Sequence, residues 1–201
     1  MSRTTQPIRK ADDVQKLLAQ LRNDNSRNAP RNYLLGVMGV HTALRVSDLL
    51  QVKWEDVYDF KRQRFNQYLE LVESKTKKGR TIRLHKDVIE ALRALLPHRR
   101  GSFLFAGNRV EVMGDGTAEY PPISRSQAHR IISGAAEAAG IEQRVSCHSL
   151  RKTFGYHAVK AGTSIPVIME IYNHSSYAVT RRYLGLVQDD MDKVYLDLKF
   201  A

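Results

Sequence analysis

The spacing of apolar residues along this chain changes twice, and no other feature restricts its fold as much. Apolar side chains recur at helical intervals over residues 14–41, alternate with polar ones between Trp54 and Leu84, and return to helical intervals over 88–96 and from residue 124 onward. A period near 3.6 indicates helices, whereas a period of 2 indicates strands. We therefore predict an α+β fold that is mainly helical, with one small antiparallel sheet of three strands on one side.

Residues that favour helix ends give approximate bounds for the helices of the first half. Asp12 and Asp13 suit the positive N-terminal end of a first helix, Pro30 suits the first turn of a second, and Ser47 is expected to cap a short third helix. A fourth helix follows the strands, and Pro97 should stop it because proline cannot continue a helix.

The alternating region is expected to form a hairpin. Residues 69–71 and 82–84 carry the alternating apolar positions, and the segment between them, S-K-T-K-K-G-R, is polar and contains Gly79. We expect this tip to be exposed. Residues 98–122 hold four glycines and two prolines, so we expect a loop there, with a third short strand through residues 103–105.

The second half of the chain is expected to be helical throughout, because each candidate helix has its own start and stop residues. The expected helices are one opened by Ser124 or Ser126 and ended by Gly140, one from about His148 to Ala161 ended by Gly162, and one started by Thr163 or Ser164 with Pro166.

The net charge points to an anionic partner. Lys and Arg number 32 against 21 Asp and Glu, which gives a formal charge of +11. Such an excess favours nucleic acid first and anionic membranes second, although a merely soluble basic protein is the simple alternative. No apolar run approaches the length of a membrane span, and the N-terminal segment lacks the apolar core of a secretory signal.

Cysteine and histidine spacing argues against structural metals and disulfides. Cys147 is the single cysteine, so it cannot form an internal disulfide, and a reducing cytoplasm fits. Seven histidines are present, but none has the spacing of H-E-x-x-H or a comparable ligand motif. We predict no structural metal and no cofactor.

Several polar residues in short motifs stand out, although each is weak alone. H-x-x-R at His148 and Arg151 places two phosphate-binding side chains on one helix face. Arg45 lies among apolar neighbours in A-L-R-V-S-D-L-L, where a simple ion pair with Asp48 is an alternative. The others are Lys75 in S-K-T, His174 in N-H-S-S and Tyr183 in R-R-Y-L-G.

Taken in order, these motifs resemble those of the tyrosine recombinases of the phage integrase type. Six positions match in sequence from Arg45 to Tyr183, which covers most of the chain. The resemblance implies an integrase-like catalytic domain with the fold of DNA breaking-rejoining enzymes. It also implies cleavage and rejoining of double-stranded DNA through a 3′-phosphotyrosyl bond, leading to integration, excision or inversion.

The resemblance assigns a role to each matching residue. Tyr183 is the expected nucleophile, His148 the group that handles its proton, and Lys75 the acid that protonates the departing 5′-oxygen. Arg45, Arg151 and His174 are expected to contact the reacting phosphate. Beyond the motifs, we expect the basic residues of the hairpin tip to lie against the DNA backbone, with a solvated turn as the alternative: Lys77, Lys78 and Arg80.

The ends of the chain raise questions of domain organisation. We expect residues 1–201 to form one catalytic domain without the N-terminal domain that most family members carry, either as a naturally single-domain protein, resembling the small inverting switches, or as a fragment. Residues 186–201 contain an amphipathic helix. It either folds back or, as in the family, docks on a neighbouring protomer of a tetramer.

The chain departs from the family pattern at one helix end, and two other functions would fit parts of the sequence. Tyr172 and Asn173 stand where the family usually has Leu-Gly, and Asn is the next best residue after Gly at a left-handed helix end. A type IB topoisomerase would use similar chemistry, and a non-catalytic DNA-binding module would share the charge.

The resemblance also implies strand exchange without ATP or Mg²⁺, accessory DNA-bending proteins, and a prokaryotic, phage or mobile-element setting.

Overall fold

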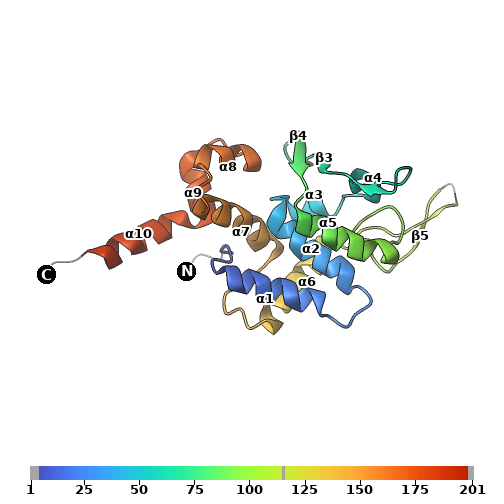
Figure 1. The fold of residues 1–201 in the computed structure, drawn as a ribbon, viewed down its shortest axis with the longest axis horizontal. Helices are drawn as coiled ribbons and strands as arrows, with labels where there is room; N and C mark the ends of the chain where they lie inside the picture. The colour runs from blue at the N-terminus through green and yellow to red at the C-terminus, as the bar shows by residue number, and fades with distance from the viewer. Residues whose placement is uncertain (1–4, 115, 199–201) are drawn as a thin grey trace.

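A computed structural model describes residues 5–114 and 116–198 of the chain. The main body is a group of helices that enclose the larger apolar core: α1 (Ala11–Arg22), α2 (Ala29–His41), α5 (Lys86–Leu95), α6 (Arg125–Ala138) and α7 (Cys147–Lys160). Helix α2 lies at the centre and packs against α1, α5 and α7 (Figure 1). The core includes Trp54, Phe105 and Leu150, all at most 2% exposed.

The helices begin and end much as the sequence predicts. Ser124 caps α6 by accepting a hydrogen bond from the backbone N–H of Gln127 at 3.1 Å, and Ser146 caps α7 in the same way through Ser149. Gly140 and Gly162 follow these helices with positive φ. Each cap satisfies backbone groups that a helix end leaves unpaired.

Two short helices differ from the sequence prediction. Helix α3 (Val46–Leu49) is capped by Arg45 rather than Ser47, which lies inside it. Trp54–Val57 forms helix α4 instead of the start of a strand. The reason is a local cap: the Asp56 carboxylate accepts a 2.7 Å hydrogen bond from the backbone N–H of Lys53. Trp54 and Val57, three residues apart, then both face the core.

The mainly helical α+β class is confirmed, but the expected three-stranded sheet is wrong. Within the described residues the strands form three separate antiparallel pairs. The central pair joins β3 (Tyr68–Val72) to β4 (Gly79–Arg83), with Leu69 opposite Ile82 as the alternation predicts. The other strands are β1 (Tyr58–Asp59), β2 (Arg64–Phe65), β5 (Glu111–Val112) and β6 (Ala118–Glu119).

The predicted third strand is only an isolated bridge. Phe103 pairs with Lys53 alone, and Ala106 pairs with Pro122 alone. Leu104 and Phe105 are consecutive yet both buried, so this segment enters the core rather than alternating between two faces. A 3₁₀ turn, η1 (Leu96–His98), contains Pro97 and follows α5.

The last three helices form a smaller unit beside the main body. Helices α8 (Ile165–Tyr172) and α9 (Tyr177–Leu184) pack on α7 around a second apolar cluster that includes Tyr172 and Leu184. Helix α10 (Leu186–Asp197) extends away from the rest of the molecule toward the C-terminus (Figure 1). Across residues 5–114 and 116–198, no helix combines the length and apolar character needed to cross a bilayer.

Candidate functional site

A left-handed turn places Arg45 and presents two carbonyl groups to other arginines. Ala43 adopts φ 55°, a conformation that residues with a Cβ seldom hold, and it is fully buried. Its carbonyl oxygen accepts a hydrogen bond from Nη1 of Arg151. The carbonyl of Thr42 accepts one from Arg80 at 3.3 Å. The end of α2 therefore holds two guanidinium groups beside the start of α3.

Glu73 is the centre of the polar network and was not singled out from the sequence. Its side chain is inaccessible to solvent. The carboxylate accepts hydrogen bonds from Arg45 Nη1 at 2.9 Å, Arg80 Nη1 at 3.0 Å and Thr76 Oγ1 at 2.8 Å. Burial alone would raise the pKa of Glu73, but the hydrogen bonds from Thr76, Arg80 and Arg45 outweigh it and lower the pKa to about 2.

Arg45 thus pairs with Glu73, and the alternative of a pair with Asp48 is wrong. Asp48 instead holds the hairpin turn, because its Oδ1 accepts hydrogen bonds from the backbone N–H and the hydroxyl of Ser74, at 3.0 and 2.5 Å. Ser74 directly precedes Lys75 in the turn. Asp48 holds Ser74 and Glu73 holds Thr76, so the residues on both sides of Lys75 are fixed.

Arg151 is almost fully buried and has its planar group stacked on an aromatic ring. Its guanidinium carbon lies 4.5 Å from the centre of the Tyr172 ring, and Nη2 is 3.4 Å from the Tyr172 carbonyl oxygen. Tyr172 in turn donates a 2.6 Å hydrogen bond from its hydroxyl to the Arg151 carbonyl. These contacts hold the Arg151 side chain in one orientation.

The Tyr183 ring lies between two histidines. The ring centres of His148 and His174 are 5.2 and 5.1 Å away, both edge-on, and Tyr172 is 5.5 Å away. The Tyr183 hydroxyl is buried and forms no hydrogen bond of normal geometry in the described chain, but it lies close enough to the Arg151 guanidinium for a weak contact. Burial raises the pKa of Tyr183, while this contact and the nearby charges of Arg151 and Arg45 oppose that rise.

Both histidines are biased toward their neutral forms. Partial burial, followed by the charges of Lys152, Arg151 and Arg45, lowers the pKa of His148 to about 4, although part of the residue is open to solvent. Burial and the same two arginines lower the pKa of His174. Neutral imidazoles can accept protons at neutral pH.

The contact of His174 with Thr180 favours one tautomer of the ring. Thr180 donates its hydroxyl hydrogen to the Ser176 carbonyl at 2.9 Å, so it acts as acceptor toward Nδ1 of His174, 3.1 Å away. Nδ1 therefore carries the hydrogen. In the neutral ring, Nε2 then holds the free lone pair and faces away from this bond.

The fold brings together five of the six predicted catalytic residues, and the sixth stays apart. Arg45, Arg151, His148, His174 and Tyr183 share one network of contacts and charges. Lys75 is exposed in the hairpin turn, as are Lys77 and Lys78. Arg80 differs from the expected outward position because its side chain, only 12% exposed, is bound to Glu73.

Sequence reasoning missed two further members of the site. Lys152 follows Arg151 on α7, and its Nζ lies 5.0 Å from the centre of the Tyr183 ring while it donates a 2.7 Å hydrogen bond to the Thr5 carbonyl. Asn173 was noted only for its backbone; its side chain also donates to Glu73. The signal for Lys152 was its place next to H-S-L-R, whereas nothing in the sequence pairs residue 173 with residue 73.

Comparisons with known proteins agree on one family. A model of the phage integrase family matches residues 9–189. The chain is 35% identical over 194 residues to the probable integrase/recombinase YoeC of Bacillus subtilis, with 94% of each protein covered. It is 28% identical over 181 residues to the tyrosine recombinase XerD of Mycobacterium leprae, which covers 86% of this chain and 54% of that protein.

Solved structures share the fold. XerH recombinase bound to a palindromic difH substrate has a TM-score of 0.71 at 19% identity, covering 95% of this chain and 52% of that one. A lambda integrase tetramer bound to a Holliday junction has a TM-score of 0.63 at 22% identity, covering 91% and 49%. The chain thus spans nearly all of YoeC but about half of XerD, XerH and lambda integrase.

Proposed function

The chain belongs to the phage integrase family of tyrosine recombinases, and on that premise we propose that it is a site-specific recombinase of double-stranded DNA. The proposal rests above all on one observation. The hydroxyl of Tyr183 is buried, forms no hydrogen bond of normal geometry in the described chain, and lies beside Arg151 and within reach of the charge of Arg45. A phenol placed in this way is poised to attack a phosphodiester that enters the arginine pocket.

In this mechanism Tyr183 attacks the phosphorus, its phenolic proton leaves, and the bond to the 5′-oxygen breaks. A 3′-phosphotyrosyl ester and a free 5′-hydroxyl result. The neutral phenol is a weak nucleophile, so proton removal must accompany attack. His148 is in edge contact with the ring and is neutral at pH 7, which suits it to accept that proton.

The arginine pocket has an excess of positive charge for one phosphate. Glu73 contributes one negative charge, while Arg45, Arg80 and Arg151 contribute three positive charges. Glu73 holds the Arg45 and Arg80 side chains in place, and its single negative charge leaves the pocket with a net positive charge. The remaining charge would stabilise the oxygens of the transition state with little reorganisation, because Arg151 is already held by Ala43 and Tyr172.

His174 can contribute a hydrogen bond to the phosphate only when it is protonated, because its neutral tautomer has no hydrogen on Nε2. We propose that an entering phosphate raises the pKa of His174 and so turns Nε2 into a donor. Lys75, on the exposed hairpin turn, is proposed to reach the departing 5′-oxygen once DNA is bound. Lys77 and Lys78 would then contact the backbone, with affinity that falls as salt rises.

The other proposed properties follow from the family and the surface. Each of two related structures, XerH and lambda integrase, contains DNA, and one is a tetramer on a Holliday junction. We propose that this chain likewise assembles on DNA, as a tetramer, helped by accessory DNA-bending proteins, and acts in the cytoplasm. Residues 1–201 would act as one catalytic domain, without ATP, metal or another cofactor in the reaction.

A nicked suicide substrate tests the proposal. After the short oligonucleotide that carries the new 5′-hydroxyl diffuses away, the wild-type protein should remain covalently bound to DNA in a denaturing gel, and Tyr183→Phe should give no adduct. Tyr177→Phe is the matched control, because Tyr177 is on the same helix but 52% exposed. An adduct with Tyr183→Phe would refute the assignment of the nucleophile, and loss of the wild-type adduct in EDTA that added Mg²⁺ restores would refute a reaction without catalytic metal.

A further inference from the structure

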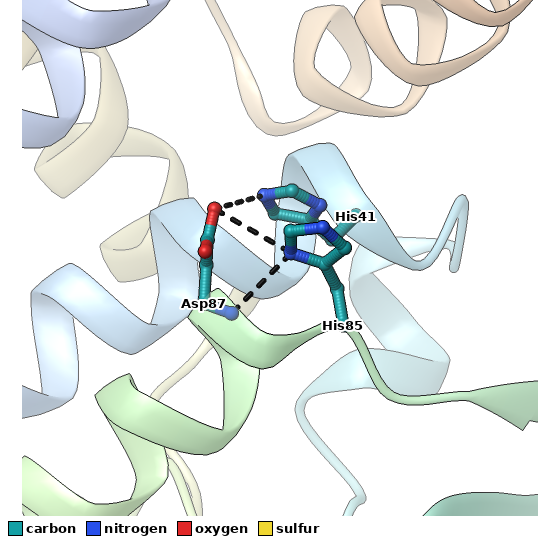
Figure 2. A group of neighbouring side chains, drawn as sticks. All are labelled: His41, His85 and Asp87. Atoms are coloured by element: carbon teal, nitrogen blue, oxygen red, sulfur yellow. Dashed lines mark hydrogen bonds and ion pairs between the residues drawn. The ribbon is translucent and has the colours of Figure 1, made fainter.

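Two histidines and an aspartate meet outside the catalytic site. His41 is the last residue of α2, His85 caps α5, and Asp87 lies in the first turn of α5. Figure 2 shows the two imidazoles side by side with the Asp87 carboxylate directed toward both. One ligand atom from each residue lies within 4.8 Å of the others. In the described chain this is the only group of three such residues with that spacing.

The distances are too long for good hydrogen bonds yet suit a shared ion. Oδ2 of Asp87 is 3.6 Å from Nε2 of His41 and 3.4 Å from Nδ1 of His85. Hydrogen bonds between such atoms are usually shorter, about 2.7–3.2 Å. Atoms that bind zinc at about 2.0–2.1 Å in a tetrahedron are roughly 3.4 Å apart. The Asp87 carboxylate is therefore at a ligand-like distance from each imidazole nitrogen, and the two nitrogens lie within 4.8 Å of each other.

The surroundings also admit a cation and a small change in the rings. The negative end of the α2 dipole lies at His41 and the positive end of the α5 dipole lies at His85 and Asp87, so the two oppose each other and the Asp87 carboxylate supplies the attraction for a cation. The two rings are nearly parallel, with centres 4.6 Å apart, so one of them must turn before both lone pairs point at one ion. The His85 side chain is 48% exposed, so the rotation would break its 3.3 Å cap hydrogen bond from the Asp87 backbone N–H and its stacking on His41 but would disturb no core packing.

We propose that His41, His85 and Asp87 bind one divalent transition-metal ion of the zinc class, with water in the remaining position. Imidazole nitrogens with one carboxylate favour such ions over Mg²⁺ or Ca²⁺. This revises the expectation of no structural metal. The sequence lacked the signal because His41 and His85 are far apart in the chain, and only the packing of α2 on α5 brings them together.

The ion would act on the fold rather than on the reaction. Thr42 and Ala43 follow His41 directly, and their carbonyls hold Arg80 and Arg151. Fixing the end of α2 to the start of α5 would therefore steady the turn that leads to Arg45. The ion itself would lie outside the phosphate pocket, so the proposal does not depend on the recombinase function.

Metal titration of the tag-free, DNA-free protein tests this site. After chelation and removal of the chelator, Zn²⁺ binding is followed by calorimetry and Co²⁺ binding by its visible absorption. Wild type should bind one equivalent and show the intense bands of tetrahedral cobalt. His41→Ala and His85→Asn should each bind at least about tenfold more weakly, in line with the effect of losing a ligand or its support.

Two controls keep the result clear. His98→Ala removes an exposed histidine on another part of the surface and should bind as wild type does. His85→Asn retains a side-chain acceptor for the α5 cap, so its melting temperature in chelator should stay near that of wild type. Equal affinity in all four proteins, or no saturable binding by wild type, would overturn the proposal.

Discussion

The side-chain amide of Asn173 donates a 3.1 Å hydrogen bond to Oε2 of Glu73, a residue 100 positions earlier in the chain. Asn173 ends α8 with φ 54° and ψ 45°, the left-handed conformation that the sequence predicts for it. One asparagine therefore both ends a helix and ties the unit that carries Tyr183 to the hairpin. Through Glu73 that tie reaches Arg45 and Arg80.

Glu73→Gln should destabilise the protein and abolish the ordered arginine pocket. Removing the charge of a buried carboxylate leaves two partly buried guanidinium groups without their anion, which typically costs about 3 kcal/mol or more. Chemical denaturation measures the loss, and the suicide substrate measures the adduct. Glu70→Gln, on exposed β3 surface, should change neither. A loss below about 1 kcal/mol would mean that Glu73 is not the centre of this network.

The same carboxylate predicts acid sensitivity. The pKa of Glu73 falls from its ordinary 4.5 to about 2 in the folded protein, so folding favours the charged form. Its contribution to stability is complete above pH 4.5 and is lost as pH falls toward 2. Comparing wild type with Glu73→Gln across this range isolates the effect. The difference in stability between the two should shrink as the solution becomes more acidic, and a constant difference would contradict the assignment.

His148 should titrate far below an ordinary histidine. Its pKa is lowered from 6.5 to about 4, so the folded state favours the neutral ring. The unfolded state therefore binds the proton more readily, and His148 destabilises the folded protein increasingly as pH falls from 6.5 to 4. NMR of the DNA-free protein should give a midpoint near 4 for His148. A His148 midpoint near 6.5 would show that its partial burial beside Lys152 and Arg151 is absent in solution.

Gly155→Ala should displace the helix that carries the nucleophile. A Cβ at this position would lie 2.5 Å from the Tyr172 hydroxyl oxygen and 2.7 Å from Cδ2 of Leu184, and both side chains are fully buried. We expect a loss of about 1–3 kcal/mol, measured by thermal unfolding, together with slower adduct formation.

Gly134→Ala is the matched control for Gly155. It is in the middle of α6, and a Cβ there would meet no atom within 4 Å. Alanine favours helix over glycine, so this variant should gain about 0.5–1 kcal/mol. If Gly134→Ala and Gly155→Ala changed stability and adduct formation alike, the effect of Gly155→Ala would not come from close packing of α7 on α8 and α9.

The exposed face of α10 should matter for assembly more than for folding. Tyr195 and Leu196 are 80% and 81% exposed, so replacing both with serine should leave the melting temperature nearly unchanged. If the helix docks on a neighbouring protomer, the double variant should bind a single DNA site normally but form fewer synaptic complexes in a gel-shift assay. Equal loss of both would argue against docking. The start of α10 is held to its own domain through Asp189, which bonds Arg9 and Tyr156, while residues 191–198 are exposed, so folding back and docking both stay predictions.

Local patterns predicted most helices because a helix is specified by neighbours three and four positions apart. The start of α6 and the end of α8 followed from Ser124 and Asn173, and α7 begins at Cys147, one residue before its predicted start, with a cap at Ser146 that was not predicted. The strand prediction failed at Trp54, since one hydrogen bond to Asp56 converted a strand pattern into a helical turn. The weak periodicity of residues 103–105 concealed a segment buried on both sides.

The sequence alone determined which residue types could perform phosphate chemistry, because the ordered motifs from Arg45 to Tyr183 are local and recognisable. Only the tertiary structure decided which of them meet. It joined Glu73 to Arg45, Arg80 and Asn173, left Lys75 exposed, and placed His41 beside His85. The physical reason is that helix packing and buried hydrogen bonds act between residues far apart in the chain, where sequence spacing carries no distance information.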